Sequence, residues 1–262
     1  MTQDQATSTV TDTLDPARMV ALAASLNLPD ARPRPFWHQI YFWDAQPAPS
    51  LGPDGHPKTG ALIPDMGLPR RMWAGGRLTF HAPPRMGATA QRQTTLVSAV
   101  RKQGRTGPLG LVTLRHDITQ DGKRLVSEEQ DLVYRAADAP SGTPPPAPQD
   151  ATLTNRHLFT TTELFRYSAL TFNGHRIHYD SGYATQTEGY AGLVVHGPLL
   201  AQYLMLMAED TLGSLSSFTF RATAPLMDAE PATFCAKPSP TGLDLWVSAP
   251  CGRQCMQATA TA

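Results

Sequence analysis

The pattern of apolar and polar positions predicts two sets of strands in this chain. The first set covers residues 77–82, 91–102, 109–120 and 125–135, and the second covers 218–224, 232–237, 243–248 and 254–260. Runs of this length with alternating character are typical of strands that bury one face. Asp121-Gly122 separates two runs of the first set, and this dipeptide strongly favours a tight hairpin between antiparallel strands.

Two segments carry helix signals. In the first, Asp15 suits an N-cap, Pro16 suits the first helical position, and Pro29 ends the segment. Apolar residues recur between them at the spacing of one helix face. The second segment runs from about Tyr190 to Asp210 and is apolar around most of its circumference. A helix of that composition is expected to be buried.

Proline content divides the chain further. Residues 1–14 are polar and are predicted to be a disordered tail. Residues 139–150 are rich in proline, which fits neither a sheet ladder nor a helix interior, so we expect an extended linker there. Residues 15–138 and 151–262 then form two halves, each with about one helix and four or five antiparallel strands. The predicted fold class is α+β.

The overall composition argues against several kinds of partner. The 22 basic and 22 acidic residues cancel, and no dense basic run suggests a nucleic acid or an anionic membrane. The N-terminus resembles neither a transit peptide nor a secretion signal, and the longest apolar run, 199–207, is too short to span a bilayer. Cys235, Cys251 and Cys255 form no disulfide or zinc pattern. We expect a cytoplasmic protein with free thiols.

The stretch from residue 170 to residue 183 is the most informative part of the chain. It contains the amide Asn173 and the imidazole His178, and Gly197 follows in a His-Gly-Pro run. An imidazole titrates near neutral pH and can act as a general base. A glycine at a helix start can offer a backbone N–H to a developing oxyanion. These groups together suit the addition of water to an activated carbonyl compound.

The same residues resemble the motif of the MaoC-like, or type 2, enoyl-CoA hydratases and hydroxyacyl-thioester dehydratases, a family with the hotdog fold. The family pattern is Asp-x-Asn-Pro-x-His, followed by His-Gly-Met at about the distance that separates His178 from His196 in this chain. Asn173 stands at the Asp position, His178 at the His position and Gly197 at the oxyanion glycine. Three segments also look like the N-terminal half of the subgroup that contains mesaconyl-CoA hydratases: 51–57, 68–77 and 128–135.

The resemblance implies a tandem double hotdog, in which each half is an antiparallel sheet wrapped around a central helix. It implies catalysis in the C-terminal half and an N-terminal half that admits the acyl chain. The implied reaction is reversible addition of water to a 2-enoyl-CoA, with a branched or dicarboxylic acyl group of the mesaconyl or itaconyl kind as the leading substrate. The implied catalytic residues are Asn173, His178 and Gly197. CoA is part of the substrate, and no metal, nucleotide or flavin cofactor is expected.

Asn173 departs from the ionisable Asp of the broader family pattern. A carboxamide neither takes nor gives a proton at ordinary pH, so a pair of acid–base residues cannot be transferred intact. We expect Asn173 to orient the water or the thioester, and His178 alone to move the proton. Asp180 or Glu163 could supply a carboxylate instead, although Asp180 also suits a cap.

Arg70, Arg71 and Arg176 are the candidates for substrate binding, with Arg77 as a further member of the set. Guanidinium groups pair well with the phosphates of CoA and with a second carboxylate on the acyl group. The same arginines could instead lie on the surface or brace one half against the other. His196 is a further substrate-binding candidate, with a structural role as its alternative.

Two other function classes remain open. A hotdog thioesterase would hydrolyse the thioester with an acidic residue on the central helix, for which Glu188 and Glu209 are the candidates. A non-catalytic acyl-CoA-binding module would have no use for His178. A monomer and a homodimer are both compatible with a double hotdog.

Overall fold

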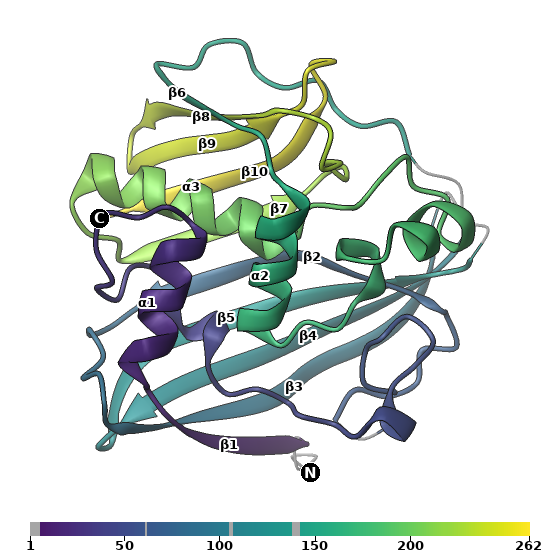
Figure 1. Ribbon diagram of the computed structural model, residues 1–262, viewed down its shortest axis with the longest axis horizontal. Helices are drawn as coiled ribbons and strands as arrows, with labels where there is room; N and C mark the ends of the chain where they lie inside the picture. The colour runs from purple at the N-terminus through teal and green to yellow at the C-terminus, as the bar shows by residue number, and fades with distance from the viewer. Residues whose placement is uncertain (1–5, 61, 105–106, 138–141) are drawn as a thin grey trace.

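The computed structural model describes residues 6–60, 62–104, 107–137 and 142–262. The strands in these residues form one antiparallel sheet of ten. The strand order is β1-β3-β4-β5-β2-β7-β10-β9-β8-β6, so each half of the chain contributes five adjacent strands (Figure 1). The N-terminal strands are β1 (Thr7–Thr13), β2 (Arg70–Phe80), β3 (Thr89–Gly104), β4 (Gly107–Gln120) and β5 (Lys123–Arg135). The C-terminal strands are β6 (Leu153–His157), β7 (Ser217–Ala222), β8 (Ala232–Ser239), β9 (Gly242–Ser248) and β10 (Gln254–Thr261).

The two halves join where β2 pairs with β7, and glycines in β2 make that pairing possible. Gly75 pairs with Arg221 and Gly76 with Phe220. A Cβ atom on Gly75 would lie 2.5 Å from the carbonyl oxygen of Phe220, and one on Gly76 would lie 2.8 Å from its ring. Both distances are too short for any side chain. The junction therefore depends on the Gly-Gly pair.

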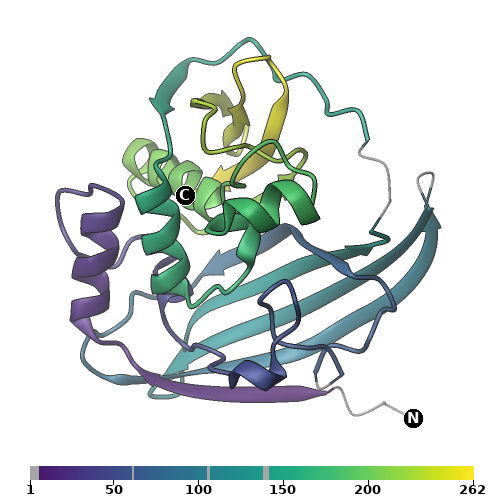
Figure 2. The same cartoon turned by 45° about the vertical axis from the view of Figure 1, so that its right-hand side comes forward.

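Three α-helices lie against the sheet: α1 (Pro16–Ser25), α2 (Thr161–Thr171) and α3 (Gly197–Leu212). Helix α3 packs across β7, β8, β9 and β10 and reaches β2, whereas α1 stands beside α2 (Figures 1 and 2). Short helical turns are η1 (Trp37–Ile40), η2 (Ala48–Ser50), η3 (Arg176–His178) and η4 (Tyr183–Thr187). None of the described helices is long and apolar enough to cross a bilayer.

Several predictions of local structure are confirmed. Asp15 caps α1 by accepting a hydrogen bond from the backbone N–H of Ala17 at 2.9 Å, and Pro16 opens the helix. Asp121 and Gly122 both have positive φ, 50° and 75°, as a tight hairpin between β4 and β5 requires. The predicted strands of both sets are present. Helix α3 is buried, and its leucines Leu199 and Leu204 have no exposed surface.

Helix α3 starts later than predicted, at Gly197 instead of Tyr190. The preceding residues lie in an irregular segment, because their backbone groups bond elsewhere. The N–H of Val194 donates to the carbonyl of Ile177 at 3.0 Å, and that of Val195 to the carbonyl of Leu226 at 2.9 Å. The apolar character of this segment reflects burial, not helix.

The predicted disordered tail is wrong over Thr7–Thr13. This segment is strand β1, and it pairs antiparallel with β3 from Thr7 opposite Thr95 to Thr13 opposite Thr89. Its threonines and valine are β-branched and favour extended structure, and β3 offers an otherwise unpaired edge. Residues 1–5 of the predicted tail lie outside the described residues.

Strand β6 and helix α2 were not predicted from the sequence. Helix α2 begins at a capping signal that was available: Thr160 accepts a hydrogen bond from the N–H of Glu163 at 3.1 Å. Residues 138–141 of the predicted linker region lie outside the described residues. The part that follows is attached to the C-terminal half, since the N–H of Ala147 donates to Gly252 and that of Gln254 to Pro145, both at 2.8 Å.

Candidate active site

A cavity of about 1830 Å³ opens between the two halves and gathers most of the predicted site residues. Asn173, His178 and Gly197 line it from the C-terminal half, and Arg70 and Arg71 line it from the N-terminal half. Pockets for drug-sized ligands are usually smaller than about 1,000 Å³, so this volume suits an extended ligand.

His178 is fixed in the form that a general base needs. Its Nδ1 lies 2.7 Å from the carbonyl oxygen of Val194. A carbonyl only accepts, so Nδ1 carries the proton and Nε2 presents its lone pair. Nε2 makes no hydrogen bond with another described residue. Burial, with a smaller contribution from His175, lowers the pKa of His178 to about 3. The imidazole is therefore neutral at working pH.

His196 lies behind His178 and does not line the cavity. The two rings stack with their centroids 3.7 Å apart and 21° between their planes. Nε2 of His196 is 2.8 Å from the hydroxyl of Ser168, and its side chain has no exposed surface. Burial holds the pKa of His196 well below its usual value. His196 thus packs against the ring of His178 from outside the cavity, although the sequence suggested substrate binding.

Asn173 follows α2 at a sharp change of chain direction. The preceding residue Phe172 has a left-handed backbone, and the N–H of Asn173 donates to the carbonyl of Ser168 at 2.8 Å. The side-chain Oδ1 accepts the N–H of His175 at 3.0 Å. This leaves Nδ2, which makes no hydrogen bond with a described residue, as a donor for a ligand. The geometry suits an orienting group.

Gly197 is the first residue of α3, at the positive end of the helix dipole. The first intrahelical acceptor, the carbonyl of His196, bonds the N–H of Leu200 at 3.1 Å. The N–H of Gly197 has no acceptor within the helix and lies on the cavity. A Cβ atom here would meet only the carbonyl oxygen of Trp73, at 3.8 Å. A side chain would therefore fit at this position.

Arg70 and Arg71 are neighbours on β2 with different environments. Arg70 donates to the carbonyl of Glu188 at 3.1 Å and lies 3.4 Å from its carboxylate. Arg71 forms no ion pair with any described residue. It pairs across the strands with Tyr134, whose hydroxyl is buried without a partner. Arg71 and Tyr134 therefore offer unused donors near the cavity.

Arg176 is not part of the cavity lining. Its guanidinium donates to the carboxylate of Asp180, at 2.7 and 3.0 Å, and to the carbonyl of Pro53 at 3.1 Å. It also lies over the ring of Tyr183, 4.2 Å from the centroid. Asp180 accepts the N–H of Tyr183 at 2.9 Å, as a cap does. Arg176 thus links the two halves through Asp180 and Pro53 and lies outside the cavity lining.

Two of the other carboxylates considered from the sequence, Glu209 and Glu163, are occupied elsewhere. Glu209 is buried near the end of α3, where Arg34 pairs with it at 2.6 Å, and it does not line the cavity. Glu163 bonds the hydroxyl of Tyr203 at 2.7 Å and the ring of His157 at 2.9 Å. Glu188, the other candidate acid for a hotdog thioesterase, does line the cavity, but it follows η4 instead of lying on α3, and Arg70 is 3.4 Å from its carboxylate.

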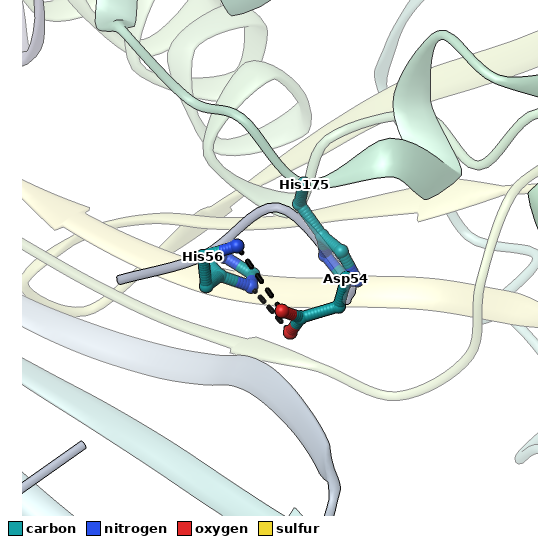
Figure 3. A group of neighbouring side chains, drawn as sticks. All are labelled: Asp54, His56 and His175. Carbon is teal, nitrogen blue, oxygen red and sulfur yellow. Dashed lines mark hydrogen bonds and ion pairs between the residues drawn. The ribbon is translucent and has the colours of Figure 1, made fainter. Parts of the chain in front are cut away.

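The loop of residues 52–57 brings two more groups to the cavity beside His175; these are Asp54 and His56, which the sequence did not single out (Figure 3). The Asp54 carboxylate accepts from the backbone N–H of His56 at 3.1 Å and from its Nδ1 at 3.0 Å. The ring of His56 lies 4.3 Å from that of His175. The only available signal was an Asp-Gly-His-Pro run that also reads as a turn.

The same three side chains contain the donor types that bind divalent metals. One donor atom from each of Asp54, His56 and His175 lies within 4.8 Å of the others. The Asp54 carboxylate is, however, already bonded to His56, and the rings of His56 and His175 pack against each other with their centroids 4.3 Å apart and their planes tilted by 44°. The arrangement fits a hydrogen-bonded dyad better than a metal centre.

Comparison with known proteins decides the family. A profile of the family described as hydroxyacyl-thioester dehydratase type 2 matches residues 36–228. The chain is 42% identical to the mesaconyl-C(4)-CoA hydratase of Chloroflexus aurantiacus, with 97% of this chain and 94% of that protein aligned. The chain belongs to the hydroxyacyl-thioester dehydratase type 2 family. It is also 27% identical to the mitochondrial hydroxyacyl-thioester dehydratase type 2 of Schizosaccharomyces pombe, over 82% of this chain and 80% of that one.

Solved structures confirm the fold. A MaoC-like dehydratase from Phytophthora capsici matches with a TM-score of 0.74 at 13% identity, covering 98% of this chain and 95% of that one. A Mycobacterium tuberculosis protein described as a double hotdog matches with a TM-score of 0.58 at 15% identity, over 95% and 92%. The fold is the predicted tandem double hotdog, in which the second unit wraps around α3. By its family, the protein is a hydro-lyase that hydrates or dehydrates an acyl thioester.

Proposed function

We propose that the protein adds water reversibly to the α,β double bond of an enoyl-CoA that carries a second carboxylate, as mesaconyl-CoA does. The observation that carries this proposal is His178. Its Nδ1 is fixed on the Val194 carbonyl, and its neutral Nε2 is free in a cavity that Asn173 and the start of α3 also line. These three groups match the three requirements of hydration: a base, an oriented water and an oxyanion donor.

In the hydration direction, His178 Nε2 takes a proton from a water molecule that Asn173 Nδ2 holds. The water oxygen bonds to the β-carbon, and negative charge moves onto the thioester oxygen. The N–H of Gly197 and the positive end of α3 stabilise that charge. The neutral state of His178 supports this role, because a protonated imidazole could not accept the proton.

Arg71 is the group proposed to bind the second carboxylate. It lines the cavity, lacks an ion pair among the described residues, and lies across from the unpartnered hydroxyl of Tyr134. A guanidinium beside a phenol hydroxyl is a suitable partner for a carboxylate. Burial lowers the pKa of His56 and of His175, and the charge of Arg71 adds a smaller contribution in the same direction, so that charge reaches this side of the cavity.

The substrate class has support from the relatives. The Chloroflexus aurantiacus protein aligned over nearly the whole of both chains is a mesaconyl-C(4)-CoA hydratase. The Schizosaccharomyces pombe relative, at lower identity, is a hydroxyacyl-thioester dehydratase. The proposal takes the more similar relative as the guide to the acyl group, and the free guanidinium of Arg71 agrees with it.

The test uses mesaconyl-C(4)-CoA and crotonyl-CoA with the purified protein, with loss of the enoyl-thioester absorbance as the readout. The proposal predicts loss of absorbance with both esters, faster with the dicarboxylic one, and no release of free thiol. It also predicts the same rates after treatment with a chelator, since no cofactor is proposed. Free thiol appearing at the rate of absorbance loss would instead identify a thioesterase.

A further inference from the structure

The loop of residues 52–57 comes from the N-terminal half but is fastened to the hydratase motif of the C-terminal half. The backbone N–H of Arg176 donates to the carbonyl of Asp54 at 2.9 Å, and its side chain donates to the carbonyl of Pro53 at 3.1 Å. Both bonds involve the residue two positions before His178. The loop is therefore part of the same constellation as the proposed base.

Two glycines allow the loop and the motif to touch. Gly55 has a φ of +89°, and a Cβ atom on it would lie 1.9 Å from the carbonyl oxygen of Gly174. A Cβ atom on Gly174 would lie 2.6 Å from the carbonyl oxygen of Gly55. No side chain fits at either position. This contact sets the place of the residues on both sides of Gly55, which are Asp54 and His56.

His56 is held like a catalytic imidazole. Asp54 accepts from its Nδ1 at 3.0 Å, so the opposite nitrogen, Nε2, faces away from the carboxylate and makes no hydrogen bond with a described residue. The His56 side chain keeps 21% of its surface exposed and lines the cavity. A carboxylate on the far nitrogen fixes the ring and stabilises the imidazolium, as in other carboxylate–imidazole pairs.

His56 and His178 line the same cavity and share one neighbour, His175. The centroid of the His175 ring lies 4.3 Å from that of His56 (Figure 3) and 5.4 Å from that of His178. His175 makes no hydrogen bond to a carboxylate among the described residues, and burial lowers its pKa to about 3. Burial lowers the pKa of His56 as well, and its hydrogen bond with Asp54 opposes that shift. Of these three rings, His56 is the one with a hydrogen bond to a carboxylate among the described residues.

We propose that His56 is a second catalytic residue, which gives a proton to the α-carbon during hydration, and that Asp54 is its positioning residue. This inference rests on the proposed function. The water gives one proton to His178 Nε2 and its oxygen to the β-carbon. The electron pair of the double bond then takes a proton from His56 Nε2 at the α-carbon. The proton on His178 returns to His56 through cavity water, so both groups end as they began.

Asn173 is the reason that a second group is needed. An amide cannot deliver a proton, and a base that has just taken one from water on the β-side must otherwise carry it to the α-carbon itself. The Asp54–His56 pair supplies an ionisable group on the other side of His175. The acid–base function is then shared between the two halves of the molecule.

The test compares His56→Gln, Asp54→Asn and the control His81→Gln, which removes an exposed imidazole after β2, with wild type. His56→Gln is expected to lower kcat at least about a hundredfold on both crotonyl- and mesaconyl-CoA, in the range of general acid–base catalysis, with little change in KM. His81→Gln is expected to leave kcat unchanged. Thermal unfolding of each variant checks that it is folded.

The pH profile separates catalysis from a structural role. Hydration needs protonated His56, so the wild-type rate should fall as pH rises through the pKa of His56, and His56→Gln should lack this fall. Burial lowers the pKa of His56, and the hydrogen bond with Asp54 partly offsets this, so in Asp54→Asn the pKa should drop further and the fall should move to lower pH.

Wild-type kcat with an unaltered pH profile in folded His56→Gln would overturn the inference. So would loss of wild-type activity on chelation with recovery on adding zinc, since His56 would then be a metal ligand. Failure of the wild type to hydrate either ester would overturn the proposed function instead.

Discussion

The two halves of the double hotdog contribute different things to one cavity. The C-terminal half has short strands, such as β8 and β9 with 8 and 7 residues, and wraps them closely around a buried helix. The N-terminal half has long strands, with 16 residues in β3 and 14 in β4, and a polar inner face that includes the buried pair His38–Glu128 at 2.8 Å. The first arrangement fixes a base and a helix start, whereas the second leaves room for a ligand.

The hydratase motif in the C-terminal half therefore contains the proposed catalytic groups but not the whole site. The base, the orienting amide and the oxyanion glycine all belong to the C-terminal half. Arg71 and the Asp54–His56 pair reach the same cavity from the N-terminal half. Substitutions in the C-terminal half should therefore affect every substrate, and some in the N-terminal half should affect only certain acyl groups.

His178→Ala is expected to have the largest effect. The variant lacks the proposed general base, so kcat should fall by about 10²–10⁴ on both crotonyl- and mesaconyl-CoA. The measurement is loss of enoyl-thioester absorbance, with His81→Ala as a control that also removes an imidazole. A fall of less than tenfold would mean that the C-terminal half does not supply the base.

Gly197→Pro is expected to come next, because it removes the N–H while keeping a residue that suits the start of a helix. His196 already has an extended ψ of 129°, which a following proline accepts. The expected loss in kcat is about 10²–10³.

Gly197→Ala is the matched variant, since it keeps the N–H and its Cβ meets nothing closer than 3.8 Å. It should retain nearly full kcat. Equal losses in the two variants would show that the glycine matters for space and not for its N–H.

Arg71→Met should act selectively. Removing the guanidinium leaves the second carboxylate unpaired, at a cost of about 2 kcal/mol, or roughly thirtyfold in kcat/KM for mesaconyl-CoA. Crotonyl-CoA has no such carboxylate and should be almost unaffected. Arg70→Met is the comparison, because Arg70 is already paired with Glu188 and its loss should not discriminate between the esters. Equal losses on both esters in Arg71→Met would remove the carboxylate-binding role.

The last prediction concerns stability and its dependence on pH, not catalysis. Burial lowers the pKa of His175 and of His178 to about 3, whereas an unfolded histidine has a pKa near 6.5. Below that value the unfolded chain takes up protons that the folded chain does not, so stability is full above about pH 6.5 and declines toward pH 3. Each histidine contributes up to about 1.4 kcal/mol per pH unit. Urea unfolding at several pH values measures this slope, and His175→Asn should reduce it. A stability independent of pH below about 6.5 would contradict the buried, neutral state of these rings.

The local signals in the sequence were enough for much of the fold. Asp15 and Pro16 define the start of α1, Asp121 and Gly122 define a hairpin, and the apolar run after Gly197 defines the buried helix, because each depends on neighbours in the chain. Strand β1 could not be found in this way. Its stability comes from pairing with β3, more than 70 residues later in the sequence.

The candidate site was likewise predictable only where it depends on residues close together in the sequence. Asn173, His178 and Gly197 follow from a motif with fixed spacing, and the structure brings them to one cavity. His56 could not be found, because its place depends on a contact between Gly55 and Gly174 in different halves of the chain. Arg176 looked like Arg71 in the sequence, and only the fold shows that the guanidinium of Arg176 is occupied by Asp180 and Pro53.

The most direct test of the account follows the oxygen of water. Wild-type protein would be incubated with mesaconyl-C(4)-CoA in water labelled with heavy oxygen, and the products analysed by mass spectrometry. The account predicts one labelled hydroxyl group on the acyl chain and an intact thioester, with label uptake strongly reduced in His178→Ala. Label in a carboxylate together with free CoA would contradict the account, since it would show that water attacks the thioester and not the double bond.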